Sequence, residues 1–223
     1  KHEANLPNMK VDGIRDVDYV LTTRELARLI KQQNIGFARL KDYYPNSPLA
    51  EYTGAGAIFG TTGGVMEAAI RTVKEIVDPK DTGLVELNSL QDVDENIKEA
   101  NIKIGDLEGC VAVVHGAVNF PKMLDMIRAN PNKYLFVEFM ACTGGCINGG
   151  GQPIVPAYLQ ERINVKKLRS KALHKIDAFM DIRKSHKNQE VKNLYQEFLK
   201  KPGSEVSHHL LHTDYTKRDI YTK

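Results

Sequence analysis

Residues 109–140 are the part of the sequence that most limits the folds open to this chain. Residues 109–115 form an unbroken apolar run, as is typical of a strand buried on both faces. Residues 118–129 carry apolar side chains at helical spacing, and residues 134–140 form a second strand-like run. Because the connections are short, this order predicts a β–α–β unit with two parallel strands and a right-handed crossover.

A loop rich in cysteine and glycine follows the second strand, at the end of a parallel sheet where functional loops usually lie. Cys142 and Cys146 form a C-x3-C pair, and five glycines lie between residues 144 and 151. Thiolates favour iron–sulfur clusters and zinc, and glycines let backbone N–H groups approach a bulky inorganic group. Zinc sites usually use C-x2-C spacing, so an iron–sulfur cluster is the better fit. The alternative is two free thiols on a flexible loop.

The number of cysteines limits what the thiols can do. The chain has 223 residues, 42% of them hydrophobic, and only three are cysteines. An odd number favours reduced thiols or metal ligands over a disulfide framework. Cys110 lies inside the first buried strand, so we expect it to be a packed core thiol.

Length and hydropathy place the chain among ordinary globular proteins of one domain or two small ones. No apolar run approaches the ~20 residues of a membrane span. No apolar signal segment follows Lys1. We therefore expect no membrane association. Because the first residue is Lys1 and not Met, we also expect that an N-terminal part is missing.

The segments before the β–α–β unit predict a short strand and two helices. Residues 18–22 are expected to form the strand, and a helix is expected from Thr23, as its N-cap, to Gln33. Residues 41–56 are loop-like. A second helix is predicted over residues 65–77, entered through the glycine-rich residues 60–64.

After Pro156 the pattern becomes helical. Residues 167–183 and 190–200 predict two amphipathic helices, the second ended by Pro202 and Gly203. We therefore predict an α/β domain over residues 1–156, with a parallel-type sheet flanked by helices, and an α-helical C-terminal appendix over residues 157–223.

The charge is unevenly distributed, although the whole chain has a net charge of only +3. Residues 161–223 carry 15 Lys and Arg against 8 Asp and Glu, whereas residues 1–160 carry 16 against 20. The basic residues alternate with acidic and apolar ones, and no arginine-rich run or RNA-binding aromatic signature is present. We expect a solvated helical face and no nucleic-acid partner.

Weaker candidate sites lie in two glycine-rich segments. Residues 54–60 match G-x-G-x3-G, but the segment before them is polar and broken by proline, which argues against a dinucleotide loop. Residues 60–64 precede a helix and are either an anion- or cluster-binding turn or a plain tight turn.

Four histidines are candidate functional groups. His208 and His212 are four residues apart, but no acid or cysteine lies close in sequence, so capping or packing is expected. His115 follows a strand, where a functional role is open, and His186 is expected at a helix junction.

The cysteine loop closely resembles a signature of one family. Residues 139–153, FMACTGGCINGGGQP, are similar to the third cluster-binding signature of the iron-only (iron–iron) hydrogenases. Residues 20–28, VLTTRELAR, and 56–69, GAIFGTTGGVMEAA, resemble the segments that precede it. Residues 183–186, 194–199 and 210–215 resemble the small-subunit-type C-terminal region, so the resemblance covers nearly the whole chain.

This resemblance implies one lobe of a two-lobed catalytic domain that interconverts protons and electrons with hydrogen. Its cofactor is a 4Fe–4S cubane joined through a cysteine sulfur to a diiron subcluster. By position, Cys142 would ligate the cubane and Cys146 would bridge cubane and diiron unit. Met140 would pack against the diiron unit. Phe59 and the turn that contains Gly63 and Gly64 would wall the cavity. The implied partners are an electron carrier such as ferredoxin and the N-terminal part of the same protein. The location expected with this resemblance is the cytoplasm, with an anaerobic organelle as the alternative.

The chain departs from the family pattern in two ways. Thr143 stands where a proline is common between the first cysteine and the glycines. This sequence also lacks the two upstream signatures of the family. Those signatures supply two further cubane cysteines, the proton-delivering cysteine and a lysine that binds a cyanide ligand. The fragment alone is therefore expected to be inactive. A non-catalytic relative, either a sensory module or an iron–sulfur assembly factor, is the alternative, and a plain interaction domain is a third.

Overall fold

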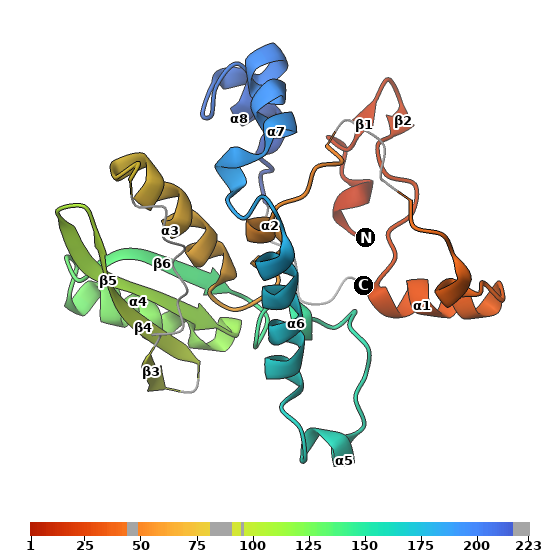
Figure 1. Cartoon of the computed structure of the whole chain (residues 1–223), viewed down its shortest axis with the longest axis horizontal. Helices are drawn as coiled ribbons and strands as arrows, with labels where there is room; N and C mark the ends of the chain where they lie inside the picture. The colour runs from red at the N-terminus through yellow and green to blue at the C-terminus, as the bar shows by residue number, and fades with distance from the viewer. Residues whose placement is uncertain (44–48, 81–90, 95, 216–223) are drawn as a thin grey trace.

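The computed structural model describes residues 1–43, 49–80, 91–94 and 96–215. A four-stranded sheet with the order β3-β4-β5-β6 lies at one end of the molecule (Figure 1). Its strands are β3 (Gln91–Asp94), β4 (Ile97–Ile104), β5 (Leu107–His115) and β6 (Tyr134–Met140). Strands β5 and β6 are parallel, and their register runs from Cys110 opposite Tyr134 to His115 opposite Met140. The predicted parallel pair is confirmed.

The other strands extend this pair into a mixed sheet. β4 pairs antiparallel with β5, and β3 pairs antiparallel with β4. The sequence interpretation did not include these strands, because β4 interleaves lysine, glutamate and asparagine with its apolar residues. Gly105 forms the turn between β4 and β5 with a φ of +58°. The fold class, a sheet flanked by helices with a helical C-terminal region, agrees with the prediction.

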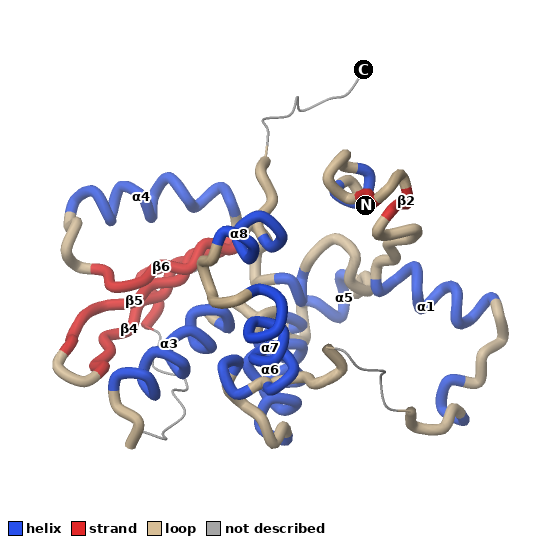
Figure 2. The backbone as a smooth tube through the Cα atoms, turned by 90° about the horizontal axis from the view of Figure 1, so that it is seen from above, coloured by secondary structure: helices blue, strands red, loops and turns tan. Residues whose placement is uncertain are grey.

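Helices cover both faces of the sheet (Figure 2). α3 (Gly64–Val77) packs on one face, and α4 (Phe120–Ala129) packs on the other. Successive side chains of a strand point to opposite faces. Val111 and Val113 of β5 therefore pack under α3, whereas Ala112 and Val114 pack under α4. The prediction of a strand buried on both faces is confirmed from Cys110 to His115.

The N-terminal segment differs from the prediction. Residues 18–22 form no strand, and Tyr19 is 88% exposed, because no neighbouring strand pairs with them in the described part of the chain. The paired strands of this segment are β1 (Lys10–Val11) and β2 (Ile14–Arg15). The predicted helix is present as α1 (Thr23–Gln32), but its cap is Thr22, whose side chain accepts the N–H of Glu25.

The loop predicted for residues 41–56 is partly wrong, since α2 (Gly54–Ile58) begins inside it. Residues 44–48 lie outside the described residues. Thr53 caps α2 by accepting the N–H of Gly56. A Cβ atom at Gly54 would lie 2.1 Å from Oδ1 of Asp177, so close packing explains this glycine and the dinucleotide-loop alternative gains no support.

The C-terminal region is helical, as predicted, but its boundaries differ. Its helices are α5 (Ala157–Gln160), α6 (Val165–Phe179), α7 (Gln189–Leu194) and α8 (Glu205–Leu211). The predicted helix over residues 190–200 changes into a π-helical turn at Tyr195–Leu199. α6 packs against α2 in the middle of the molecule (Figure 1). No helix among the described residues has the length and apolar character needed to cross a membrane.

Candidate active-site loop

The cysteine loop begins where β6 ends and carries two exposed, free thiols, those of Cys142 and Cys146. Gly144 and Gly145 have φ values of +83° and +86°, a conformation that favours glycine. The N–H of Gly145 donates to the carbonyl of Cys142 over 3.0 Å, which closes a turn between the two cysteines. A short 3-10 helix, Cys146–Asn148, then leads into the glycine run. The two thiols therefore lie on either side of one tight turn, Cys142 at its start and Cys146 directly after its end.

The glycine-rich turn before α3 lies directly against this loop. The N–H of Ile147 donates to the carbonyl of Gly60 over 3.1 Å. A Cβ atom at Gly145 would lie 2.8 Å from the same carbonyl oxygen and 3.0 Å from the nitrogen of Thr62. Two segments more than eighty residues apart in the sequence thus form one site.

Gly63 and Gly64 are both buried, and backbone geometry accounts for each. Gly63 has a φ of +85°, and a Cβ at Gly64 would lie 1.8 Å from the carbonyl oxygen of Ile58. Phe59 ends α2, next to Gly60, and is 44% exposed. Met140 ends β6 and is half-buried, and its carbonyl accepts the N–H of Gly116. The contacts of these residues with a cofactor stay predictions.

The side chain of His115 contacts the backbone of the cysteine loop. It is buried at the end of β5, and its Nδ1 accepts the N–H of Gly144 over 3.1 Å. The sequence left the role of His115 open, and the structure places its side chain in contact with the cysteine loop.

Two arginines hold the glycine run that follows Cys146. Arg169 of α6 donates to the carbonyls of Ile147 and Pro153 over 2.9 and 2.7 Å. Arg24 of α1 donates to the carbonyl of Gly150 over 2.6 Å. Sequence reasoning missed both residues, because an arginine on an amphipathic helix looks like any solvated charge.

A buried carboxylate lies beneath the turn that precedes α3. Glu138 of β6 accepts the N–H of Gly63 over 2.9 Å and the N–H of Met66 over 2.7 Å. Burial raises the pKa of Glu138, and the two N–H donors act in the opposite direction. The sequence did not indicate a role for Glu138 either, because a single polar residue in an otherwise apolar strand carries no distinct signal.

The loop suits a thiolate-bound inorganic group. A Cβ atom at Gly149 would lie 3.2 Å from the carbonyl oxygen of Cys146 and 4.0 Å from Sγ of Cys142, so this glycine lies beside the Cys142 thiol. Soft thiolate ligands and glycine-rich backbone are what an iron–sulfur cluster requires. The described residues contain no cluster of three or more His, Cys, Asp or Glu side chains suited to a metal ion. The loop therefore offers two ligands of the four that a cubane takes.

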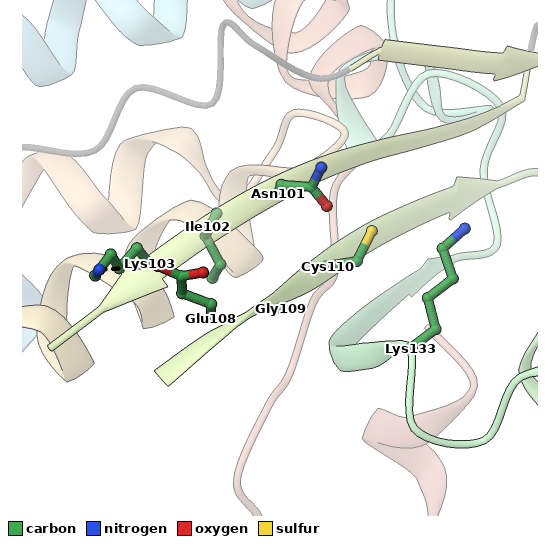
Figure 3. Close-up of a pocket in the computed structure, with 7 residues that line it drawn as sticks. All are labelled: Asn101, Ile102, Lys103, Glu108, Gly109, Cys110 and Lys133. Carbon is green, nitrogen blue, oxygen red and sulfur yellow. Dashed lines mark ion pairs between the residues drawn. The ribbon is translucent and has the colours of Figure 1, made fainter. Parts of the chain in front are cut away.

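Cys110 lies away from this loop. It pairs with Tyr134 near the start of β6, whereas Cys142 follows the end of that strand. Its side chain lines a groove together with Asn101 and Lys133 (Figure 3). Cys110 is only 5% exposed, and burial raises the pKa of its thiol. The prediction of a packed core thiol is confirmed.

The remaining histidines have structural surroundings. His186 lies in a 3-10 turn between α6 and α7, where its Nδ1 is 3.1 Å from Oγ1 of Thr72, so the predicted helix junction is confirmed. The rings of His208 and His212 stack with their centroids 4.3 Å apart, in agreement with a packing role.

Comparison with known proteins adds independent evidence. The family described as "Iron only hydrogenase large subunit, C-terminal domain" matches residues 1–150, and "Iron hydrogenase small subunit" matches residues 163–218. Iron hydrogenase 1 of Clostridium pasteurianum is 43% identical over 217 residues, which are 97% of this chain and 38% of that protein. Protein NAR1 of Arabidopsis thaliana is 28% identical over 207 residues, which are 91% of this chain and 43% of that protein.

A solved structure agrees with these matches. A variant of the [FeFe]-hydrogenase HydA1 from Chlamydomonas reinhardtii superposes with a TM-score of 0.73 at 32% identity, covering 96% of this chain and 60% of that one. The chain thus spans about two fifths of the length of the curated relatives described above. By its sequence, its fold and its cysteine loop, the chain belongs to the iron-only hydrogenase family.

Proposed function

We propose that this chain forms the cysteine-loop lobe of a catalytic domain that interconverts protons and electrons with hydrogen. The observation that carries the proposal is the loop itself. Its two exposed thiols lie on either side of one tight turn, and their loop is supported by Gly60, His115 and Arg169. A plain flexible loop would not need three such supports from separate elements.

The cofactor of this proposal is a 4Fe–4S cubane joined to a diiron subcluster. Cys142 would ligate the cubane, and Cys146 would be the thiolate shared by the cubane and the diiron unit. When bound, the group supplies redox chemistry and an open iron site, for which the protein provides ligands and a shielded pocket. Met140 and Phe59 would form part of the pocket wall, because Met140 lies two residues before Cys142 and Phe59 lies directly before Gly60.

We propose that the remaining ligands and the proton-delivering group come from a further part of a longer polypeptide. The support is the count of thiolates, since two cannot satisfy a cubane that needs four. The partners in this proposal are protons, hydrogen and an electron carrier such as ferredoxin, and the location is the cytoplasm.

A chimaera provides the main test. This chain replaces the matching 217-residue part of iron hydrogenase 1 of Clostridium pasteurianum, and the protein is produced with the hydrogenase maturation machinery. We expect hydrogen evolution from the chimaera and its loss to background in Cys146→Ala. Cys110→Ala is the matched control, because this thiol lies in the core, and it should retain activity. Full activity in Cys146→Ala would contradict the bridging role.

The chain alone is expected to assemble no active cofactor. It would be produced with iron, sulfide and the same maturation machinery, and its iron content and hydrogen evolution would be measured. Stoichiometric cluster together with hydrogen evolution from the 223-residue chain would overturn the requirement for a further part.

The second candidate is a non-catalytic relative, either an iron–sulfur assembly factor or a sensory module. The similarity to cytosolic iron-sulfur assembly component 3 of Rattus norvegicus supports the assembly-factor alternative, although its identity of 29% is well below the 43% found with iron hydrogenase 1. The complete run from Gly149 to Pro153 favours the hydrogenase. A chimaera that binds a cluster but evolves no hydrogen would favour the alternative.

A further inference from the structure

Glu138 occupies a place in the sheet where an apolar residue would be expected. It lies opposite Val113 in the parallel pair, and Val113 packs in the apolar layer beneath α3. Glu138 is only 6% exposed. Burying a carboxylate in such a layer is costly unless its charge is compensated.

The compensation comes from backbone N–H groups. The two oxygens of Glu138 accept separate hydrogen bonds, one from Gly63 and one from Met66. Burial and these two N–H groups are the influences on the pKa of this carboxylate among the described residues. Both oxygens act as acceptors at the positive end of a helix, which favours the ionised form, whereas burial raises the pKa and acts in the opposite direction.

These bonds supply α3 with the cap that it lacks locally. The N-cap residue of α3 is Gly63, which has no side chain and so supplies no side-chain cap. The N–H of Gly64 has a local acceptor, the carbonyl of Thr61. Glu138 provides the side-chain cap from a strand about seventy residues further along the chain. The start of α3 is thereby tied to the strand that ends two residues before Cys142.

A short series of contacts continues from this cap to the cysteine loop. Gly63 follows Thr62, whose nitrogen lies against Gly145, and Gly60 of the same turn accepts the N–H of Ile147. The loop is therefore attached to Glu138 twice. One connection runs along the chain through Met140, and the other runs across the turn.

We propose that Glu138 is a positioning residue that sets the turn of residues 60–64 at a fixed distance from the cysteine loop and places a buried negative charge beneath it. This inference rests on the proposed function, because it assigns Glu138 a role toward the cluster that the loop would hold. The carboxylate does not touch the thiols. It acts through the backbone of the turn and through its charge.

Amide hydrogen exchange of the 223-residue chain, followed residue by residue by NMR, tests the positioning. Glu138→Leu keeps the side-chain volume and removes both acceptors, whereas Glu138→Gln keeps one acceptor oxygen. We expect the amide of Ile147 to exchange about tenfold faster in the leucine variant, as for loss of one hydrogen bond, and at an intermediate rate in the glutamine variant. If the leucine variant does not fold, the glutamine variant decides.

Glu99→Gln is the matched control. Glu99 belongs to the same sheet but bonds Lys133 and Tyr134, so its loss should leave Ile147 unchanged. If the amides of Gly63 and Met66 exchange faster but that of Ile147 does not, Glu138 only caps α3 and does not position the cysteine loop. That result would overturn the proposal. Unchanged exchange at all three amides would overturn it as well.

The charge is tested in the chimaera loaded with its cluster. We expect Glu138→Gln to move the midpoint potential of the cluster to a more positive value, because a buried negative charge is removed. The control Glu99→Gln should leave the midpoint potential unchanged. An unmoved potential in Glu138→Gln would overturn the electrostatic part. The exchange experiment needs no cluster, so failure of the proposed function and failure of this inference are distinguishable.

Discussion

The guanidinium group of Arg71 binds both carboxylate oxygens of Asp177, over 2.8 and 2.9 Å. Arg71 lies on α3, in the part of the chain that matches the large-subunit family, and Asp177 lies on α6, in the part that matches the small-subunit family. Glu67 and Arg183 complete a network around this pair. Arg71 is only 1% exposed, so one buried network joins the two parts.

Removing one member of this network should strongly destabilise the fold. In Asp177→Asn the guanidinium of Arg71 loses a buried counter-charge, which typically costs about 3–5 kcal/mol. The measurement is the free energy of unfolding by urea. Asp125→Asn is the control, since Asp125 pairs with Arg128 on the surface and should contribute about 0–1 kcal/mol. Equal effects of the two substitutions would contradict the burial argument.

The same network should make stability depend on acid pH. Burial alone raises the pKa of Asp177, but hydrogen bonds from Arg71 and Arg183 outweigh it and lower the pKa to about 2. A carboxyl group with a lowered pKa in the folded state stabilises above its ordinary pKa of about 3.9. We therefore expect this contribution to be lost as the pH falls from about 4 to about 2. The urea midpoint should fall less steeply with decreasing pH in Asp177→Asn than in the unmodified chain. Parallel curves of midpoint against pH would contradict the assignment of this pH dependence to Asp177.

Gly64→Ala should be poorly tolerated. The new Cβ would lie 1.8 Å from the carbonyl oxygen of Ile58, a backbone atom that can move only with the turn. Overpacking of this kind typically costs about 1–3 kcal/mol, which thermal unfolding would detect. Gly150→Ala is the control, because nothing lies within 4 Å of its Cβ position. A melting temperature that is lowered equally by both substitutions would show that the turn has no special restriction.

Arg169→Lys should loosen the cysteine loop although the charge is kept. An ammonium group does not match the fork with which a guanidinium spans two carbonyls, here those of Ile147 and Pro153. We expect faster amide exchange at Gln152, whose N–H bonds the carbonyl of Gly149 within this loop. Arg162→Lys, at an exposed position before α6, is the matched control and should leave Gln152 unchanged.

Much of the site was predictable because its signals are local. The spacing of Cys142 and Cys146 and the glycines beside them are visible in the sequence, and so is the turn of residues 60–64. The parallel pair also followed from the sequence, since short connections around one helix leave few topologies. The strand predicted for residues 18–22 was wrong, because a strand exists only where another strand pairs with it.

The supports of the loop were not predictable to the same degree. Arg24 and Arg169 resemble other arginines on amphipathic helices, and Glu138 resembles a single polar interruption of a strand. Their roles depend on which backbone groups lie opposite, and this is decided by the packing of elements far apart in the sequence. The division at residue 156 stays a prediction.

The sequence by itself determined the chemistry that this protein can offer, namely two soft thiolates on a glycine-rich loop at the end of a buried strand. It could do so because residue types, and their spacing along one segment, suffice to specify ligands and backbone freedom. Only the tertiary structure decided how that loop is held. Its supports, Gly60, His115, Arg169 and, through the turn, Glu138, meet only once the sheet and helices have packed.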